Sequence, residues 1–362
     1  MERALIALLA ASVVLCLGLV AFAVGRKLRR DRHEADSAQR RATYLTLVAA
    51  GDAAALAPVL RRIRHDELAK VDLWAALGRG WPGLDDARRD ALAAAIETSG
   101  FGAALRRQVR GRDAVGRGLA IQLIGRLHLP DAWDLLAPRV NDRDGDVQLV
   151  AIRVIGELET AESARLLIET LGAHIVTPER VIERLGTPWA VPTILDALER
   201  GGLGPNRILA EIPEHLAWQP IDASLARALG LAADPRAADA LRRMLRVGGA
   251  EERVSAARSL GAIGDQGAVA DLEAALEDAE WPVRAQAARA LGMLGAEEAV
   301  PALAAHLGDE AWWVRGATAE ALGKLGEPGV AALLAALQSD DRYAHDRARE
   351  TLDLLGVAGS DA

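Results

Sequence analysis

The sequence predicts an all-α protein, an α-solenoid of helical hairpins preceded by one transmembrane helix. The chain is rich in alanine, a strong helix former, and it lacks alternating apolar and polar runs of strand length. Its 362 residues exceed the size, about 250 to 300 residues, at which a single hydrophobic core stops growing. A short motif also recurs at a fixed interval, which is typical of repeat arrays. A single cysteine and 51% hydrophobic residues exclude a disulfide scaffold and a wholly disordered chain.

The first 25 residues are predicted to be a transmembrane anchor. The segment from Ala4 to Val24 carries no charge, and its 21 residues would form a helix of about 32 Å, enough to cross a bilayer. Five basic residues follow between positions 26 and 32, so we expect a single-pass cell-membrane protein, N-out and C-in, with a cytoplasmic solenoid. The alternative is a cleavable signal peptide, because Ala21 to Ala23 has the small-x-small pattern of a processing site.

The charge of the chain is unevenly distributed. Residues 1–43 hold eight basic and four acidic side chains, and a chain total of −8 therefore leaves about −12 on the remainder. A basic collar beside an acidic body suits anionic lipid headgroups. A body of this charge is a poor partner for nucleic acid, since phosphate binding needs a basic face.

A repeat organises the rest of the chain. A leucine-glycine pair recurs every 31 residues, at Leu229-Gly230, Leu260-Gly261, Leu291-Gly292 and Leu322-Gly323. Upstream, Ile124-Gly125 and Ile155-Gly156 show the same step. Around Gly292 the apolar spacing predicts two antiparallel helices, the second beginning near Pro282, a residue suited to a first helical position. Gly295 would end that helix with a left-handed cap.

Through these motifs, among them RVSAARSLGAIG from Arg253 and VRAQAARALGMLG from Val283, the chain resembles a HEAT-repeat solenoid. The short bacterial type, also found in phycobilisome lyase subunits, is the most similar. The motifs are clearest from Arg253 to Gly356 and recognisable from Asp113 to Leu158. They match the repeat only weakly between Thr160 and Pro220. The predicted domains are a transmembrane anchor (1–25), a basic juxtamembrane linker (26–43), irregular N-terminal helical repeats (44–112), HEAT-like repeats (113–356) and a C-terminal tail (357–362).

Acidic and basic residues recur in register with the repeat. Aspartates occupy the turn between helices, at Asp142, Asp278, Asp309 and Asp340, and arginines follow in the second helix, at Arg117, Arg253, Arg284 and Arg315. The resemblance to HEAT-like families implies a structural ladder in which these aspartates and arginines pair from repeat to repeat. The alternative is an anion-binding row, which requires guanidinium groups that are free of those carboxylates.

Candidate partner-binding residues fall into two groups. Trp281, Trp312 and Tyr343 are 31 residues apart, with Trp313 beside the second, and such a row predicts either a docking strip or rings that pack over the helix ends. Arg258, Arg289 and Glu320 should share one face of the second helices. They could contribute specificity, or they could be solvated surface charge.

No catalytic, cofactor-binding or metal-binding constellation is predicted. The seven histidines form no HExxH motif, and the only His-Glu neighbour, His33-Glu34, falls in the basic linker. The absence of paired His-Glu motifs at repeat positions counts against a site like that of the HEAT-like deoxyhypusine hydroxylases. The glycine-rich stretch from Gly201 to Gly204 lacks the lysine of a P-loop, and Cys16 falls within the predicted span.

The sequence therefore predicts a membrane-anchored scaffold without enzymatic activity that binds proteins, among them a membrane enzyme such as a glycosyltransferase, but not nucleic acid. The alternatives are a bilin lyase or isomerase-like subunit, which the resemblance allows, and a HEAT-like glycosylase acting on nucleic acid, which the acidic body opposes.

Overall fold

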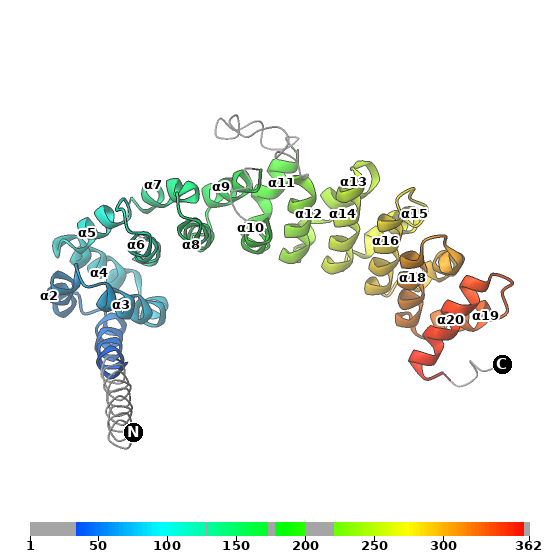
Figure 1. Cartoon of the computed structure of the whole chain (residues 1–362), viewed down its shortest axis with the longest axis horizontal. Helices are drawn as coiled ribbons and strands as arrows, with labels where there is room; N and C mark the ends of the chain where they lie inside the picture. Colours follow the sequence, from blue (N-terminus) through cyan, green and yellow to red (C-terminus); the bar gives the residue numbers. More distant parts are fainter. Residues whose placement is uncertain (1–33, 128, 130, 173–177, 200–220, 358–362) are drawn as a thin grey trace, which may run out of the picture. The chain divides into compact units, whose positions relative to one another are not determined.

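A computed structural model of the chain describes residues 34–127, 129, 131–172, 178–199 and 221–357. All regular secondary structure in these ranges is helical, and none of their residues forms a strand (Figure 1). The helices pack as two compact units that divide between Ala151 and Ile152. The all-helical fold predicted from the sequence is therefore confirmed.

The first unit begins with a helix over residues 34–50, part of which was predicted to be linker. The following helices are α2 (Ala53–Ile63), α3 (Glu67–Gly80), α4 (Asp86–Thr98), α5 (Phe101–Gln108), α6 (Ala114–Leu127), α7 (Ala132–Leu136) and α8 (Gly145–Gly156), the last of which crosses the division between the units. Side chains of Asp52, Asp66 and Asp85 cap α2, α3 and α4 by accepting a backbone N–H three residues on. These caps explain why each helix begins where it does.

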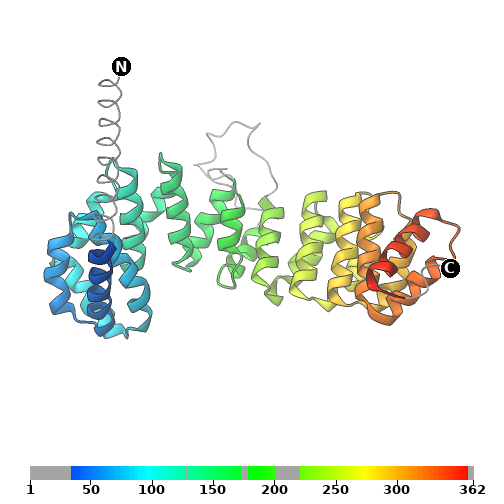
Figure 2. The same ribbon diagram turned by 60° about the horizontal axis from the view of Figure 1, so that its bottom comes forward.

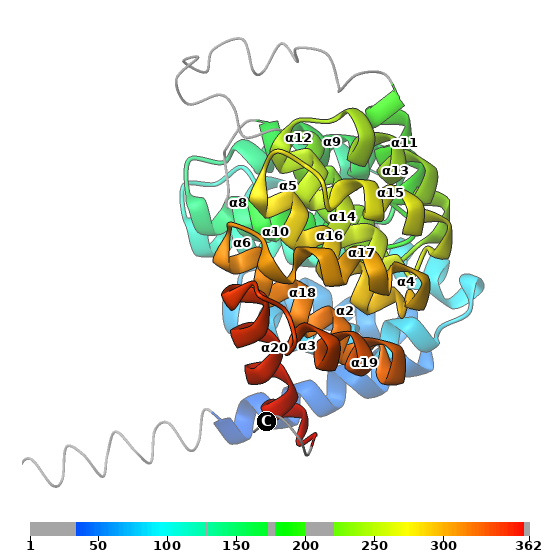
Figure 3. The same cartoon turned by 90° about the vertical axis from the view of Figure 1, so that its right-hand side faces the viewer.

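The second unit is built of helical hairpins. Its helices are α9 (Ala161–Gly172), α10 (Pro178–Leu185), α11 (Val191–Glu199), α12 (Ile221–Ala232), α13 (Ala238–Val247), α14 (Ala250–Ile263), α15 (Val269–Ala275), α16 (Trp281–Leu294), α17 (Val300–Ala305), α18 (Trp312–Lys324), α19 (Gly326–Ala336) and α20 (Arg342–Leu355). We call α12, α14, α16, α18 and α20 the second helices; they lie side by side, while α13, α15, α17 and α19 cover them as a separate layer (Figures 1 and 2). Seen end on, α20 packs against both α18 and α19 (Figure 3).

The repeated leucine-glycine pairs hold the second helices together. The four leucines of these pairs are fully buried. A Cβ atom added to Gly292 would lie 2.8 Å from the Cα atom of Ala321 in α18, so only glycine permits this approach of the two helices. Gly295 ends α16 at φ 66°, in the left-handed conformation predicted for it.

The predicted localisation, a single-pass membrane protein with a cytoplasmic solenoid, is contradicted by the structure. Within the part of the chain that the structure describes, no helix is both long and apolar enough to cross a bilayer. Helices α2 to α20 have at most 14 residues, about 21 Å of helix against a hydrocarbon core of about 30 Å. The segment from Ala4 to Val24, on which the prediction rested, lies outside the described residues.

Candidate functional site

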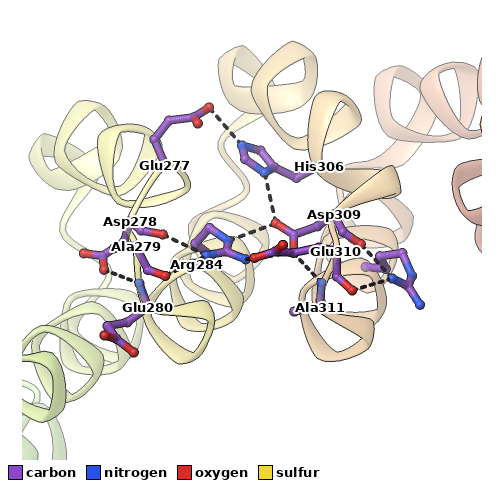
Figure 4. A network of polar contacts seen from close by, with 10 residues as sticks. Glu277, Asp278, Ala279, Glu280, Arg284, His306, Asp309, Glu310 and Ala311 are labelled. Atoms are coloured by element: carbon purple, nitrogen blue, oxygen red, sulfur yellow. Dashed lines mark hydrogen bonds and ion pairs between the residues drawn. The ribbon is translucent and has the colours of Figure 1, made fainter.

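Arginines at the start of the second helices join successive turns of the second unit. The Arg284 guanidinium donates from Nε and Nη2 to the two carboxylate oxygens of Asp309, each over 2.9 Å (Figure 4). Its Nη1 donates to the backbone carbonyl of Asp278 over 2.8 Å, in the turn that precedes α16. Asp309 in turn accepts from the backbone N–H of Ala311 over 2.8 Å. One arginine thus ties its own turn to the turn of the next hairpin, 25 residues later.

The same bidentate contact occurs at two further places. Arg253 donates to Asp278 over 2.7 and 2.8 Å, and Arg117 in the first unit donates to Asp142 over 3.0 and 2.6 Å. Both aspartates again lie 25 residues after their arginine. Because these guanidinium groups are occupied by carboxylates, they do not form the free row that anion binding would require. We call Asp142, Asp278 and Asp309 the ladder carboxylates.

The ladder carboxylates have lowered pKa values. Burial by itself raises the pKa of the Asp309 carboxyl, but hydrogen bonds from Arg284 and from the Ala311 amide outweigh it and leave the pKa below its usual value. The pKa values of Asp142 and Asp278 are lowered in the same way, by Arg117 and Arg253 against the effect of burial. Each carboxylate is therefore held in its charged form.

Arg315 and Asp340, the next expected pair, are not brought together. Among the described residues Asp340 has no ion-pair partner, and the Arg315 guanidinium lies 4.4 Å from the centre of the Tyr343 ring. The period shortens by one residue here, so Ser339 rather than Asp340 occupies the ladder position, and its hydroxyl accepts from the backbone N–H of Asp341 over 3.1 Å, two residues on, as the ladder carboxylates do. The shift in register leaves Arg315 to stack on an aromatic ring.

Four aromatic side chains gather where α16, α18 and α20 begin. Trp281 and Trp313 stack with ring centroids 6.5 Å apart, and Trp313 meets Trp312 edge to face at 4.7 Å. Arg347 lies 5.3 Å from the Trp312 ring. Trp281, Trp312, Trp313 and Tyr343 remain 43%, 52%, 54% and 59% exposed, respectively. We call these four residues the aromatic cluster. It differs from the evenly spaced row expected from the repeat, because Trp313 contacts both Trp281 and Trp312, which occupy equivalent positions.

The second helices leave one narrow stripe of side chains open. Arg258 and Arg289 are exposed, whereas the residues directly before and after each of them are buried. Arg227 occupies the same register in α12 and is half-buried, and Glu320 does so in α18 and accepts from Lys324 over 2.7 Å. Arg227 was not among the predicted residues, although it stands 31 residues before Arg258 in the sequence.

A buried aspartate in the first unit, which no sequence pattern predicted, anchors the first described helix. Asp72, 1% exposed in α3, accepts from Arg40 over 2.7 Å and from Arg41 over 2.8 Å, and also from the Ser37 hydroxyl. Burial by itself raises the pKa of Asp72, but the hydrogen bonds from these three donors lower it by more. The pKa therefore lies below its usual value. These contacts hold the helix over residues 34–50 against α3.

Metal-binding side chains do not cluster in the part of the chain that the structure describes. No group of three or more histidine, cysteine, aspartate or glutamate side chains there could hold a metal ion. Cys16 and the stretch from Gly201 to Gly204 lie outside the described residues.

Two family models match the C-terminal part of the chain. Residues 269–353 match HEAT repeats, and residues 252–278 match the PBS lyase HEAT-like repeat. No curated protein matches the chain. Similar solved structures include an engineered protein, at 20% identity and a TM-score of 0.34, covering 90% of this chain and 96% of that one. Human deoxyhypusine hydroxylase in complex with glycerol is 22% identical with a TM-score of 0.30, covering 80% and 98%. Importin beta is 18% identical with a TM-score of 0.36, covering 82% and 43%.

The chain therefore contains a HEAT-repeat domain within an all-helical, solenoid-like fold. Stacked helical hairpins of this kind present an extended surface built from equivalent positions, which suits them to binding protein partners.

Proposed function

We propose that this protein is a non-catalytic scaffold that binds a protein partner through its C-terminal HEAT repeats, with the aromatic cluster as the docking anchor. The observation that carries the proposal is the exposure of three tryptophans and a tyrosine in mutual or cation–π contact at the start of three successive second helices. Tryptophan, tyrosine and arginine are the residues that most often dominate the binding energy of protein interfaces.

The cluster is pre-arranged for this role. Trp312 and Trp313 follow each other in the first turn of α18, and ring contacts restrict both. Binding of a partner over these two side chains costs little conformational entropy, because their rotational freedom is already restricted in the free protein. The HEAT-like repeats proposed from the sequence, residues 113–356, extend beyond the matched segment and provide the rest of the scaffold. A membrane enzyme as partner is not part of this proposal, because that expectation rested on the predicted span.

The test begins with the full chain carrying a photo-crosslinking amino acid in place of Trp313. The matched control places it at Val247, which is 85% exposed at the end of α13 in the other layer. A partner crosslinked from position 313 and not from 247 is then purified, and its affinity for the chain is measured by calorimetry.

The Trp312→Ala/Trp313→Ala double variant should bind that partner about 30-fold or more weakly, as truncation of hot-spot residues does. Val247→Ala should leave the affinity within about two-fold. Equal crosslinking from both positions, or unchanged affinity of the tryptophan variant, would refute the proposal.

A further inference from the structure

The open stripe of the second helices contains three arginines that have no partner in the part of the chain that the structure describes. Among the described residues, the guanidinium groups of Arg227, Arg258 and Arg289 make no ion pair and no hydrogen bond. This distinguishes them from Arg253 and Arg284 on the same helices, which are held by ladder carboxylates. The guanidinium group at this position is therefore available to a ligand in three successive repeats.

We propose that Arg227, Arg258 and Arg289 bind an extended acidic segment of a protein partner that carries a carboxylate at every third residue. The proposal rests on the scaffold function above and specifies the chemistry of the partner. Guanidinium groups pair readily with carboxylates because their planar donor geometry matches the two oxygens.

The spacing follows from helix packing. The three arginines lie at one register of neighbouring, closely packed helices, and the axes of packed helices are about 8 to 10 Å apart. A polypeptide in extended or polyproline II conformation advances about 3.1 to 3.3 Å per residue, so three residues span about 10 Å. Carboxylates at every second or fourth residue would be about 6.5 or 13 Å apart and could not meet all three arginines.

The surroundings limit which anion fits. Leu231 and Met293, 60% and 53% exposed, lie one helical turn beyond Arg227 and Arg289 and offer apolar contacts to the residues between the carboxylates. In α18 the register is occupied by Glu320, so the row ends after three arginines. The chain as a whole carries −8, which repels a densely charged polyanion such as nucleic acid more strongly than a segment with one charge in three residues.

The experiment measures fluorescence anisotropy of labelled synthetic peptides with the purified full chain at low salt. One peptide has glutamate at every third position, and two peptides of identical composition have it at every second or every fourth position. The first should bind at least about five-fold more tightly than the others, and its affinity should fall with added salt.

Variants of the row provide the decisive comparison. Arg227→Gln, Arg258→Gln and Arg289→Gln should each weaken binding about three-fold, and their combination about 30-fold. Arg243→Gln is the matched control, since Arg243 is exposed in α13 of the other layer and also has no partner among the described residues. Glu320→Arg should lengthen the row and tighten binding of a peptide with a fourth glutamate by about three-fold.

Equal affinity for the three peptides, no binding of any, or unchanged binding by the triple variant would overturn the inference. Tighter binding of single-stranded DNA that depends on the same arginines would also overturn it, in favour of a general anion site. Loss of partner binding in the Trp312→Ala/Trp313→Ala variant but not in the triple arginine variant would refute this inference and leave the scaffold function standing. Retention of partner binding in both variants would refute this inference and also the role of the aromatic cluster as the docking anchor.

Discussion

Replacing each ladder carboxylate by asparagine should destabilise the protein in proportion to the burial of the ion pair it breaks. Side-chain exposure of arginine and aspartate is 2% and 3% for Arg117–Asp142, 9% and 6% for Arg284–Asp309, and 21% and 13% for Arg253–Asp278. Removing one partner of a fully buried ion pair costs about 3 to 5 kcal/mol, because the other charge stays buried without compensation. Exposed pairs contribute only about 0 to 1 kcal/mol.

The three substitutions should therefore differ in cost. Asparagine keeps an oxygen that can accept the backbone N–H at the turn, so what is lost is mainly the negative charge that compensates the arginine. We expect about 3 kcal/mol for Asp142→Asn, about 2 for Asp309→Asn and about 1 for Asp278→Asn. The first would remove a large share of the free energy of unfolding of a typical domain, about 5 to 15 kcal/mol.

Native-state hydrogen exchange is the appropriate assay, because repeat arrays often unfold in parts rather than in one transition. Asp309→Asn should lower the protection of amides in α16 and α18, which the pair connects, more than in α12. A double-mutant cycle with Arg284→Met checks the mechanism, since removal of both charges should cost less than the sum of the single changes. Equal costs for all three asparagine variants, or additivity in the cycle, would refute the reasoning from burial.

Other perturbations test the close packing and the charges of the two units. Gly292→Ala should destabilise the second unit by about 1 to 3 kcal/mol in urea unfolding, because its Cβ would clash with the backbone of α18, whereas Gly316→Ala, with open space around it, should stabilise by about 0.5 to 1 kcal/mol. The free energy of unfolding should fall below about pH 4, because the ladder carboxylates have pKa values below those of the unfolded chain and lose their contribution as they protonate; a pH titration of urea midpoints that stayed flat there would contradict this. Burial, and secondarily Glu252, raise the pKa of Asp222, so Asp222→Asn should increase the unfolding free energy at neutral pH and lose that advantage as the pH falls. Asp72→Asn should release the helix over residues 34–50 from α3, seen as faster proteolysis within that helix and nowhere else.

The 31-residue period was sufficient to predict the hairpins of the second unit. The repeated motif predicts both the helix ends at glycine, such as Gly295, and the buried positions at leucine. It does so because equivalent residues make equivalent packing contacts in each repeat. The prediction failed where the register changes or where no repeat exists. Because the register shifts by one residue before α20, Arg315 lies against Tyr343 and is not paired with Asp340. The contacts of Asp72 have no equivalent elsewhere among the described residues.

The position of the aromatic side chains could not be predicted from the period alone. Equivalence of Trp281 and Trp312 suggested that these two rings would be neighbours in a row, yet Trp313 makes the stacking contact with Trp281. The first turn of α18 presents two adjacent large rings, and which of them turns toward the preceding helix depends on side-chain rotamers that the spacing does not fix. The sequence located the cluster but not its internal arrangement.

The division between structural and available arginines has a simple origin in the sequence. Arg253 and Arg258 both lie on α14, five residues apart. Twenty-five residues after Arg253 stands Asp278, which takes up its guanidinium group, whereas the same step from Arg258 leads to the buried Val283. The pattern repeats on α16, where Arg284 meets Asp309 but the same step from Arg289 leads to the buried Val314. A carboxylate introduced within reach of Arg289 should therefore convert it into a structural residue. This would weaken peptide binding without removing the arginine, which separates the loss of an available charge from the loss of the side chain itself.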